Sequence, residues 1–404
     1  MTSPKIGRRS VLTASLALGA TMVAGRAGAQ SAPKEIKLGQ TMPYSGPASA
    51  YGTIGKVQLA YFKKINDEGG INGRKINLIS VDDGYSPPKA VEQVRKLVEQ
   101  DEVLALFQTL GTPGNSAIHK YVNGKKVPHL FLATGATKWN DPKNYPWTVG
   151  FNLSYQTEGE IYARYLIKNK PNAKVAILYQ NDDYGKDYLK GIKDVLSGPN
   201  AKMIVAEATY EVADPTVDSQ ILTLKASGAD TFINITTPKF AAQAIRKVHD
   251  LGWKPLHLLN NVGASVGSVL TPAGLDKSID IVTVQYYKDA TDPQWKDDPA
   301  MLEWRGFMAK FYREGNVEDA SNIYGYIAAQ TMVQVLKQCG NDLSRENILK
   351  QAQNLKKFKQ SLLLPGITMS TSATDHSPID QAQLAKFNGK QWVLFGEVLG
   401  SAAN

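Results

Sequence analysis

Short apolar runs alternate with amphipathic stretches over the first third of the chain. Between the runs, apolar residues recur at helical spacing, and Leu59, Phe62 and Ile65 should share one helix face. Such alternation is typical of βαβ units, whose strands are parallel and buried on both faces. We therefore expect a parallel sheet built from four strands, which fall at 36–42, 75–82, 103–107 and 129–132.

A second series of the same kind begins after Phe151, so the pattern predicts two α/β units in tandem. Residues 279–287 favour β-structure and are expected to cross back to the first unit, residues 299–355 should be almost wholly helical, and Asn388-Gly389 should turn a hairpin over 383–397. The remaining helices are expected at 155–169, 217–227 and 239–251, and the remaining strands at 174–179, 203–210, 231–235 and 257–259.

The first 29 residues have the three parts of a secretory signal peptide. Basic residues, among them the pair Arg8-Arg9, precede an apolar stretch over 11–24, and Ala27-Gly28-Ala29 forms an A-x-A cleavage site. The arginine pair favours twin-arginine export, with Sec export as the alternative. The apolar stretch is too short to span a membrane. No cysteine lies near the cleavage site, so we expect a mature protein that is free in the periplasm.

Composition narrows the choice of function. The formal net charge is +9, but no basic run interleaved with aromatic residues indicates a nucleic-acid partner. The single cysteine, Cys339, excludes an internal disulfide and lies in an apolar helical pattern, where we expect a core thiol. The sequence contains no P-loop, G-x-G-x-x-G or H-E-x-x-H motif. We therefore expect no cofactor, no metal and no catalytic residue.

Two loops rich in Gly and Thr follow the third and fourth expected strands. The first runs from Thr109 to Thr112 and leads into a helix at Pro113, and the second is Ala133 to Thr137. Loops at the carboxyl ends of parallel strands form clefts, and helix N-termini attract anions. The pair can therefore bind a carboxylate through N–H and O–H groups. The alternative is that both are ordinary strand-to-helix turns.

Several motifs, in this order, resemble the periplasmic leucine/isoleucine/valine-binding protein family. They are YSGPASAYG, NDEGGINGRKI, VDDGYSPPKAVEQVRKLV, YQNDDYGKDYLKG and SGADTFIN, and the similarity covers nearly the whole mature chain. The resemblance implies a type I solute-binding protein of an ABC importer, with two Rossmann-like α/β lobes, parallel-core sheets and three hinge crossovers. It places lobe 1 at 34–152 plus 285–365 and lobe 2 at 153–284 plus 366–404. It also implies a monomer that docks on an inner-membrane permease.

The resemblance also implies a set of ligand-binding residues. Tyr51 and Tyr184 match aromatic wall positions, one from each lobe, whereas Asp182 and Asp183 are expected to cap a helix. The carboxylate of the ligand would be bound by the two loops, at Thr109, Gly111, Thr112, Ala133, Thr134, Gly135 and Thr137.

Two positions depart from the family pattern. Where branched-chain amino-acid binders carry an acidic partner for the ligand's ammonium, this chain has Val262, and a Tyr is replaced near Thr237. Burying an unpaired ammonium costs several kcal/mol. We therefore expect a carboxylate without an α-ammonium, such as an aromatic acid, with Asn260, Asn261 and Thr237 near its far end. A branched-chain or other amino acid is the alternative, since an acid from another segment can supply the missing charge.

Two other classes of function deserve comparison. Gly263 to Gly267 matches G-x-S-x-G and His376 follows it, as a hydrolase requires. Ser265 is more simply explained as a helix N-cap. An amide-type sensor of the same fold is a third possibility, but an export signal without an attached signalling segment argues against it.

Overall fold

The computed structural model describes residues 35–400. The predicted signal peptide, Met1 to Ala29, lies outside the described residues. Within them, no helix is long and apolar enough to cross a membrane.

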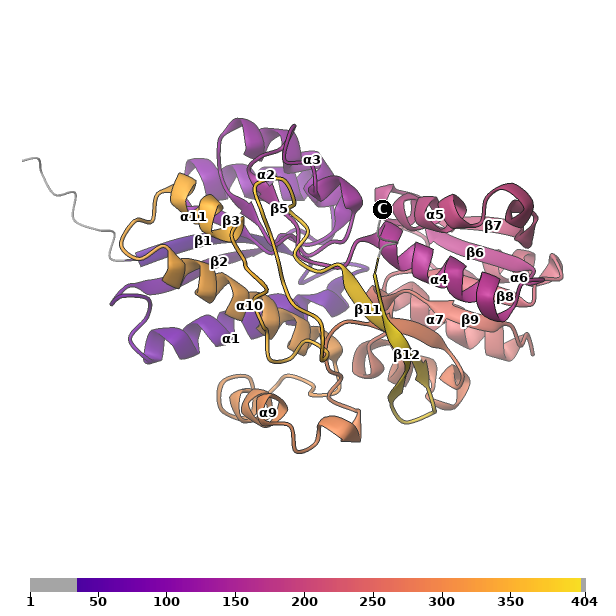
Figure 1. Cartoon of the computed structure of the whole chain (residues 1–404). Helices are drawn as coiled ribbons and strands as arrows, with labels where there is room; N and C mark the ends of the chain where they lie inside the picture. Colours follow the sequence, from indigo (N-terminus) through magenta and orange to yellow (C-terminus); the bar gives the residue numbers. More distant parts are fainter. Residues whose placement is uncertain (1–34, 401–404) are drawn as a thin grey trace, which may run out of the picture. The chain divides into compact units, whose positions relative to one another are not determined.

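The first sheet is wholly parallel, with strand order β2-β1-β3-β4-β5 (Figure 1). Strands β3 and β4 are short, because Gln108 and Phe131, just after them, have positive φ values of 54° and 56° and leave the extended region. All four predicted strands are confirmed, although the third begins later than predicted and the fourth ends earlier. The strands are β1 Glu35–Met42, β2 Lys75–Asp82, β3 Ala105–Phe107, β4 His129–Leu130 and β5 Thr148–Val149.

Helices from two distant parts of the chain pack around this sheet, α1 (Gly52–Asp67) directly against α10 (Ala320–Gln338). The prediction that Leu59 shares the buried face of α1 is wrong. Leu59 is 40% exposed, because the stripe through Val57, Tyr61 and Ile65 faces the core and residue 59 lies on the other side of the helix. The other helices of this group are α2 Pro87–Glu99, α3 Thr112–Gly124, α9 Pro299–Phe311 and α11 Arg345–Ala352.

Two details of these helices bear on the sequence analysis. Helix α3 begins at Thr112, so Pro113 is its second residue and not its first. Cys339 is buried at the C-terminal end of α10, which confirms a core thiol. Burial raises the pKa of this thiol to about 12.

The second sheet has the order β12-β11-β10-β9-β8-β6-β7. The five strands from β10 to β7 in this order are parallel, and β11 and β12 form an antiparallel hairpin beside β10. The hairpin prediction is confirmed, although its connection spans 388–391, where the Asn388 side chain accepts the N–H groups of Lys390 and Gln391. The strands are β6 Val175–Gln180, β7 Ile204–Tyr210, β8 Thr231–Ile235, β9 Leu256–Leu259, β10 Val282–Gln285, β11 Gln381–Phe387 and β12 Trp392–Gly400.

The chain passes between the two sheets three times. It does so between β5 and α4, between β10 and α9, and between α11 and β11. The segment expected to cross back contributes β10 to the second sheet before the chain leaves that sheet. This arrangement confirms two α/β units with three crossovers, while the exact lobe limits stay a prediction. The long helices beside the second sheet are α4 Tyr155–Asn169, α5 Asp183–Val195, α6 Asp218–Ala226 and α7 Pro238–Asp250.

A candidate ligand-binding cavity

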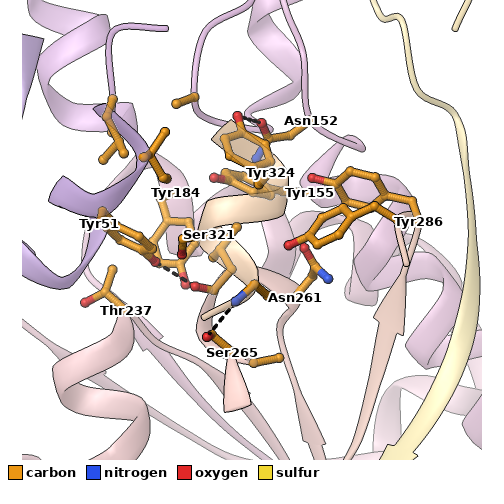
Figure 2. Close-up of a pocket in the computed structure, with 18 of the residues that line it drawn as sticks. Tyr51, Asn152, Tyr155, Tyr184, Thr237, Asn261, Ser265, Tyr286, Ser321 and Tyr324 are labelled. Atoms are coloured by element: carbon orange, nitrogen blue, oxygen red, sulfur yellow. Dashed lines mark hydrogen bonds between the residues drawn. The ribbon is translucent and has the colours of Figure 1, made fainter. Parts of the chain in front are cut away.

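The main candidate site is a cavity between loops that follow strands of both sheets (Figure 2). The empty space inside it, including open solvent, is about 790 Å³. Leu110 to Thr112 follow β3, Ala133 follows β4, Thr237 follows β8, and Asn261 to Ser265 follow β9. Ligands of parallel α/β sheets bind at these carboxyl ends. The fold therefore directs two sets of loops to one site.

The structure brings eight of the twelve predicted ligand-binding residues into the wall of this cavity. These are Tyr51, Gly111, Thr112, Ala133, Tyr184, Thr237, Asn261 and Val262. Small side chains at Ala320 and Ser321, the first residues of α10, complete the wall.

The other four predicted residues lie outside the wall. The Thr109 hydroxyl is buried and hydrogen-bonded to Asn115 and His129, both at 2.6 Å. Thr134, Gly135 and Thr137 line a second, smaller cavity. The positions of these four residues therefore do not support the prediction that they bind the ligand. Thr134 is nevertheless close to the wall, since its hydroxyl lies 2.6 Å from that of Thr112.

The first loop offers fewer free N–H groups than we expected. The Gly111 N–H donates to Ala133 O at 3.3 Å and the Ala133 N–H donates to Thr109 O at 3.1 Å, so both extend the sheet hydrogen bonding. Gly111 has φ 93°, and a Cβ there would lie 2.5 Å from the Tyr85 ring. The N–H of Thr112, the first residue of α3, has no acceptor within residues 35–400. A free N–H at a helix N-terminus is the kind of donor that anionic groups bind.

Tyrosines dominate the cavity wall, and three of them are anchored by their hydroxyl groups. Tyr51, labelled in Figure 2, donates to Val262 O at 2.8 Å and so links the first-sheet side to the second. The Tyr184 hydroxyl accepts from Asn260 at 2.7 Å, and Tyr324 donates to Asn152 at 2.7 Å. A buried phenol that keeps a partner combines apolar area with a fixed orientation.

Five tyrosines of this wall were not predicted from the sequence. Tyr286 and Tyr287 directly follow β10, and Tyr85 and Tyr155 follow β2 and β5 by a few residues, so position after a predicted strand was a usable signal. Tyr324 lies inside α10, and its approach to the cavity depends on how that helix packs on α1.

Polar contacts join the first-sheet side to the second-sheet side. The Ser265 hydroxyl donates to Asp319 Oδ1 at 2.9 Å, and the Gly267 N–H donates to Glu318 O at 2.9 Å. Lys138 pairs with Asp183 at 2.6 Å. The two sides therefore meet around the cavity.

The same contacts decide between the roles proposed for Ser265. Its side chain accepts the Ser268 N–H, which confirms the helix N-cap. His376 lines the second cavity, and its Nδ1 bonds to Thr148 O at 2.6 Å. Ser265 and His376 therefore do not form a nucleophile–base pair. Asp182 caps α5, whereas Asp183 is the first helical residue and contacts Lys138.

The cavity wall carries very little charge. Its lining residues include no Lys, Arg or His, and Asp289 is their one carboxyl group. No acid lines the cavity from the loops after β8 and β9, and Val262 is an apolar wall residue there. Among residues 35–400, no group of His, Cys, Asp and Glu is arranged to hold a metal ion.

A buried glutamate lies directly behind the wall. Glu158 Oε1 accepts the N–H of Asn261 at 2.7 Å, and its carboxyl group also accepts the hydroxyls of Tyr162 and Tyr188, both at 2.8 Å. Burial raises the pKa of Glu158 to about 7, against the lowering effect of these hydrogen bonds. Glu158 therefore holds the loop that carries Asn261 and Val262.

Comparison with known proteins identifies the family. The model of the periplasmic binding protein family matches residues 35–391. The chain is 24% identical to the Leu/Ile/Val-binding protein homolog 7 of Brucella suis biovar 1 (strain 1330), over 77% of this chain and 79% of that protein. This confirms the resemblance seen in the sequence, without supporting an aromatic-acid branch.

Solved structures show the same fold. A branched chain amino acid ABC transporter structure from Thermus thermophilus with bound valine superposes with a TM-score of 0.82 at 16% identity, covering 91% of this chain and 97% of that one. The fatty acid ABC transporter substrate-binding protein from Thermomonospora curvata gives 0.75 at 21% identity, covering 91% and 92%. The chain therefore belongs to the periplasmic binding protein family, whose members bind solutes and are not enzymes.

Proposed function

We propose that this protein is the periplasmic solute-binding component of an ABC importer. The observation that carries the proposal is the cavity, whose wall is drawn from loops at the strand ends of both sheets. A ligand bound there contacts both sides at once, so it stabilises the arrangement in which they meet. The closed protein, as a monomer, would then deliver the ligand to an inner-membrane permease.

The first ligand class that we propose is a small carboxylate with an aromatic body. The carboxylate would accept the Thr112 N–H at the start of α3, since hydrogen bonds to a charged acceptor are stronger than neutral ones. Tyr51 and Tyr184 would flank the ring, and Val262 would face it as an apolar wall. Ring contacts of this kind contribute about 0.5 to 1.5 kcal/mol beyond area burial.

A branched-chain or other amino acid is the second candidate. The names of its relatives favour it, because they include Leu/Ile/Val-binding homologues and a structure with bound valine. The cavity also has one carboxyl group, Asp289, that can serve an ammonium. Neither argument depends on Val262, the residue that disfavours an amino acid. The affinities of the two ligand classes therefore need to be compared directly.

A panel of ligands separates the candidates. Benzoate, 4-hydroxybenzoate, 4-hydroxycinnamate, leucine, isoleucine and valine would be screened by thermal shift, since a ligand specific for the folded state raises its melting temperature. Calorimetry would then measure Kd. We expect an aromatic acid to bind at micromolar Kd or tighter, and the three amino acids at least about tenfold more weakly. Tight leucine binding without aromatic-acid binding would establish the second candidate.

A pair of variants tests the carboxylate site itself. Thr112→Ala removes the hydroxyl but keeps the N–H, whereas Thr112→Pro removes both. Proline suits the first turn of a helix, and α2 already begins with Pro87-Pro88. We expect Thr112→Pro to weaken carboxylate binding about tenfold more than Thr112→Ala does. Equal affinities of the two variants would exclude the Thr112 N–H as the donor.

A further inference from the structure

Asp289 is the charged residue of the cavity wall, and it comes from neither of the predicted ligand loops. It lies in the connection between β10 and α9, after Tyr286 and Tyr287, and is only 3% exposed. Its Oδ1 accepts both the N–H and the hydroxyl of Thr291. No donor to Oδ2 is found in the described part of the chain. One carboxylate oxygen therefore remains for a ligand.

The cations beside Asp289 are directed elsewhere. Lys288 pairs with Asp298 at 2.7 Å, and Arg305 donates to Ala290 O at 2.6 Å. The acidic neighbours Asp292 and Asp319 are buried as well, and after burial itself their charges help to raise the pKa of Asp289, against the Thr291 hydrogen bonds. The protein thus leaves this carboxyl group without a compensating charge. A buried carboxylate of this kind is costly until it gains a donor.

We propose that Asp289 determines ligand specificity by requiring a hydrogen-bond donor, an ammonium or a hydroxyl, on the bound carboxylate. The inference rests on the proposed function and deepens it. A donor gains a charge-assisted hydrogen bond and removes the desolvation cost of the lone carboxylate, whereas a ligand with an apolar atom there does neither. Both candidate classes contain such donors, the ammonium of an amino acid and the phenol of a hydroxylated aromatic acid.

Two matched ligand pairs test this requirement. Leucine is compared with 4-methylpentanoate, which lacks only the ammonium, and 4-hydroxybenzoate with benzoate, which lacks only the hydroxyl. Calorimetry on the full mature protein gives the Kd ratio within each pair. We expect the donor-bearing member of the pair that binds to have a Kd at least about tenfold lower. The pair that shows this ratio identifies the donor as ammonium or hydroxyl.

The variant Asp289→Asn keeps the shape of the side chain and removes its charge. It should reduce the ratio to below about threefold, while Asp297→Asn, an exposed change in the same connection, should leave the ratio unchanged. An unchanged ratio in Asp289→Asn that folds with a normal melting temperature would overturn the inference. If Asp289→Asn does not fold, the wild type alone still tests the inference. A Kd ratio near one in both ligand pairs would then overturn it. Absence of binding by every compound would instead refute both proposed ligand classes.

Discussion

Closure of the cavity can be blocked at a residue that does not touch the ligand. Gly267 is outside the cavity wall, but its backbone packs against the 316–319 segment, which precedes α10 on the first-sheet side. A Cβ at Gly267 would lie 2.6 Å from Asn316 Nδ2 and 2.8 Å from both Asp319 N and Glu318 C. Normal contact requires about 3.5 Å or more. The variant Gly267→Ala must therefore separate the two sides by several tenths of an ångström.

Overpacking of this size costs about 1 to 3 kcal/mol, which corresponds to roughly a tenfold to hundredfold weaker affinity if ligand binding requires the closed form. Calorimetry of Gly267→Ala should show this loss. Small-angle scattering at saturating ligand should show that the radius of gyration decreases in the wild type on binding. The ligand-free variant should keep a normal melting temperature, because opening relieves the contact.

Gly306→Ala is the matched control, since a Cβ at this glycine of α9 meets nothing within 4 Å. It should bind like the wild type. The reasoning fails if Gly267→Ala binds with wild-type affinity, or if the wild type has the same radius of gyration with and without ligand. A lower melting temperature of the free Gly267→Ala protein would show that the clash destabilises the fold and not only the closed form.

Three further predictions follow from the cavity wall and the N-terminus. Because the folded pKa of Glu158 is raised from 4.5 to about 7, the folded state binds more protons and stability should fall as pH rises through this interval, by up to roughly 3 kcal/mol. Urea unfolding at pH 5 and pH 8 should show a smaller difference for Glu158→Gln than for the wild type or Glu160→Gln, and equal differences would contradict this. Tyr51→Phe removes the hydrogen bond to Val262 O and should weaken ligand binding about two- to tenfold in calorimetry, whereas an unchanged Kd would show that this contact is not needed in the bound form. N-terminal sequencing of the exported protein should show that Met1 to Ala29 is absent, and retention of this segment would refute the predicted cleavage.

The sequence predicted most of the fold because the apolar runs have no competing interpretation. Strands such as Lys75–Asp82 and Thr231–Ile235 have the predicted limits, and so does the helix Tyr155–Asn169. Errors occurred where tertiary contacts decide. Leu59 fits a helical stripe, but packing of α1 on both the sheet and α10 selects a different face. The helical periodicity of the sequence alone does not determine which face of α1 is buried.

The candidate site was predictable where it follows local chain geometry. Gly111, Thr112, Ala133, Thr237 and Val262 all lie within a few residues of a strand end, and all line the cavity. Only part of each predicted loop lines the cavity, and the ligand-binding role of these residues stays a prediction. The side chain of Thr109 does not line the cavity, and its hydroxyl is hydrogen-bonded to Asn115 and His129 instead. Asp289 could not be found, because its connection to α9 carries no motif and its burial comes from distant elements.

The polar groups of the cavity differ in how far they can adapt to a ligand. A tyrosine hydroxyl can donate or accept, and those of Tyr286 and Tyr287 have no hydrogen-bond partner among residues 35–400, so they can serve either kind of ligand atom. The Thr112 N–H can only donate, and an ionised Asp289 can only accept. Groups of fixed polarity reject the wrong ligand atom more strongly than adaptable ones, because the mismatch leaves them buried and unpaired. Selectivity in this cavity should therefore depend on Thr112 and Asp289, with the tyrosines supplying area and shape.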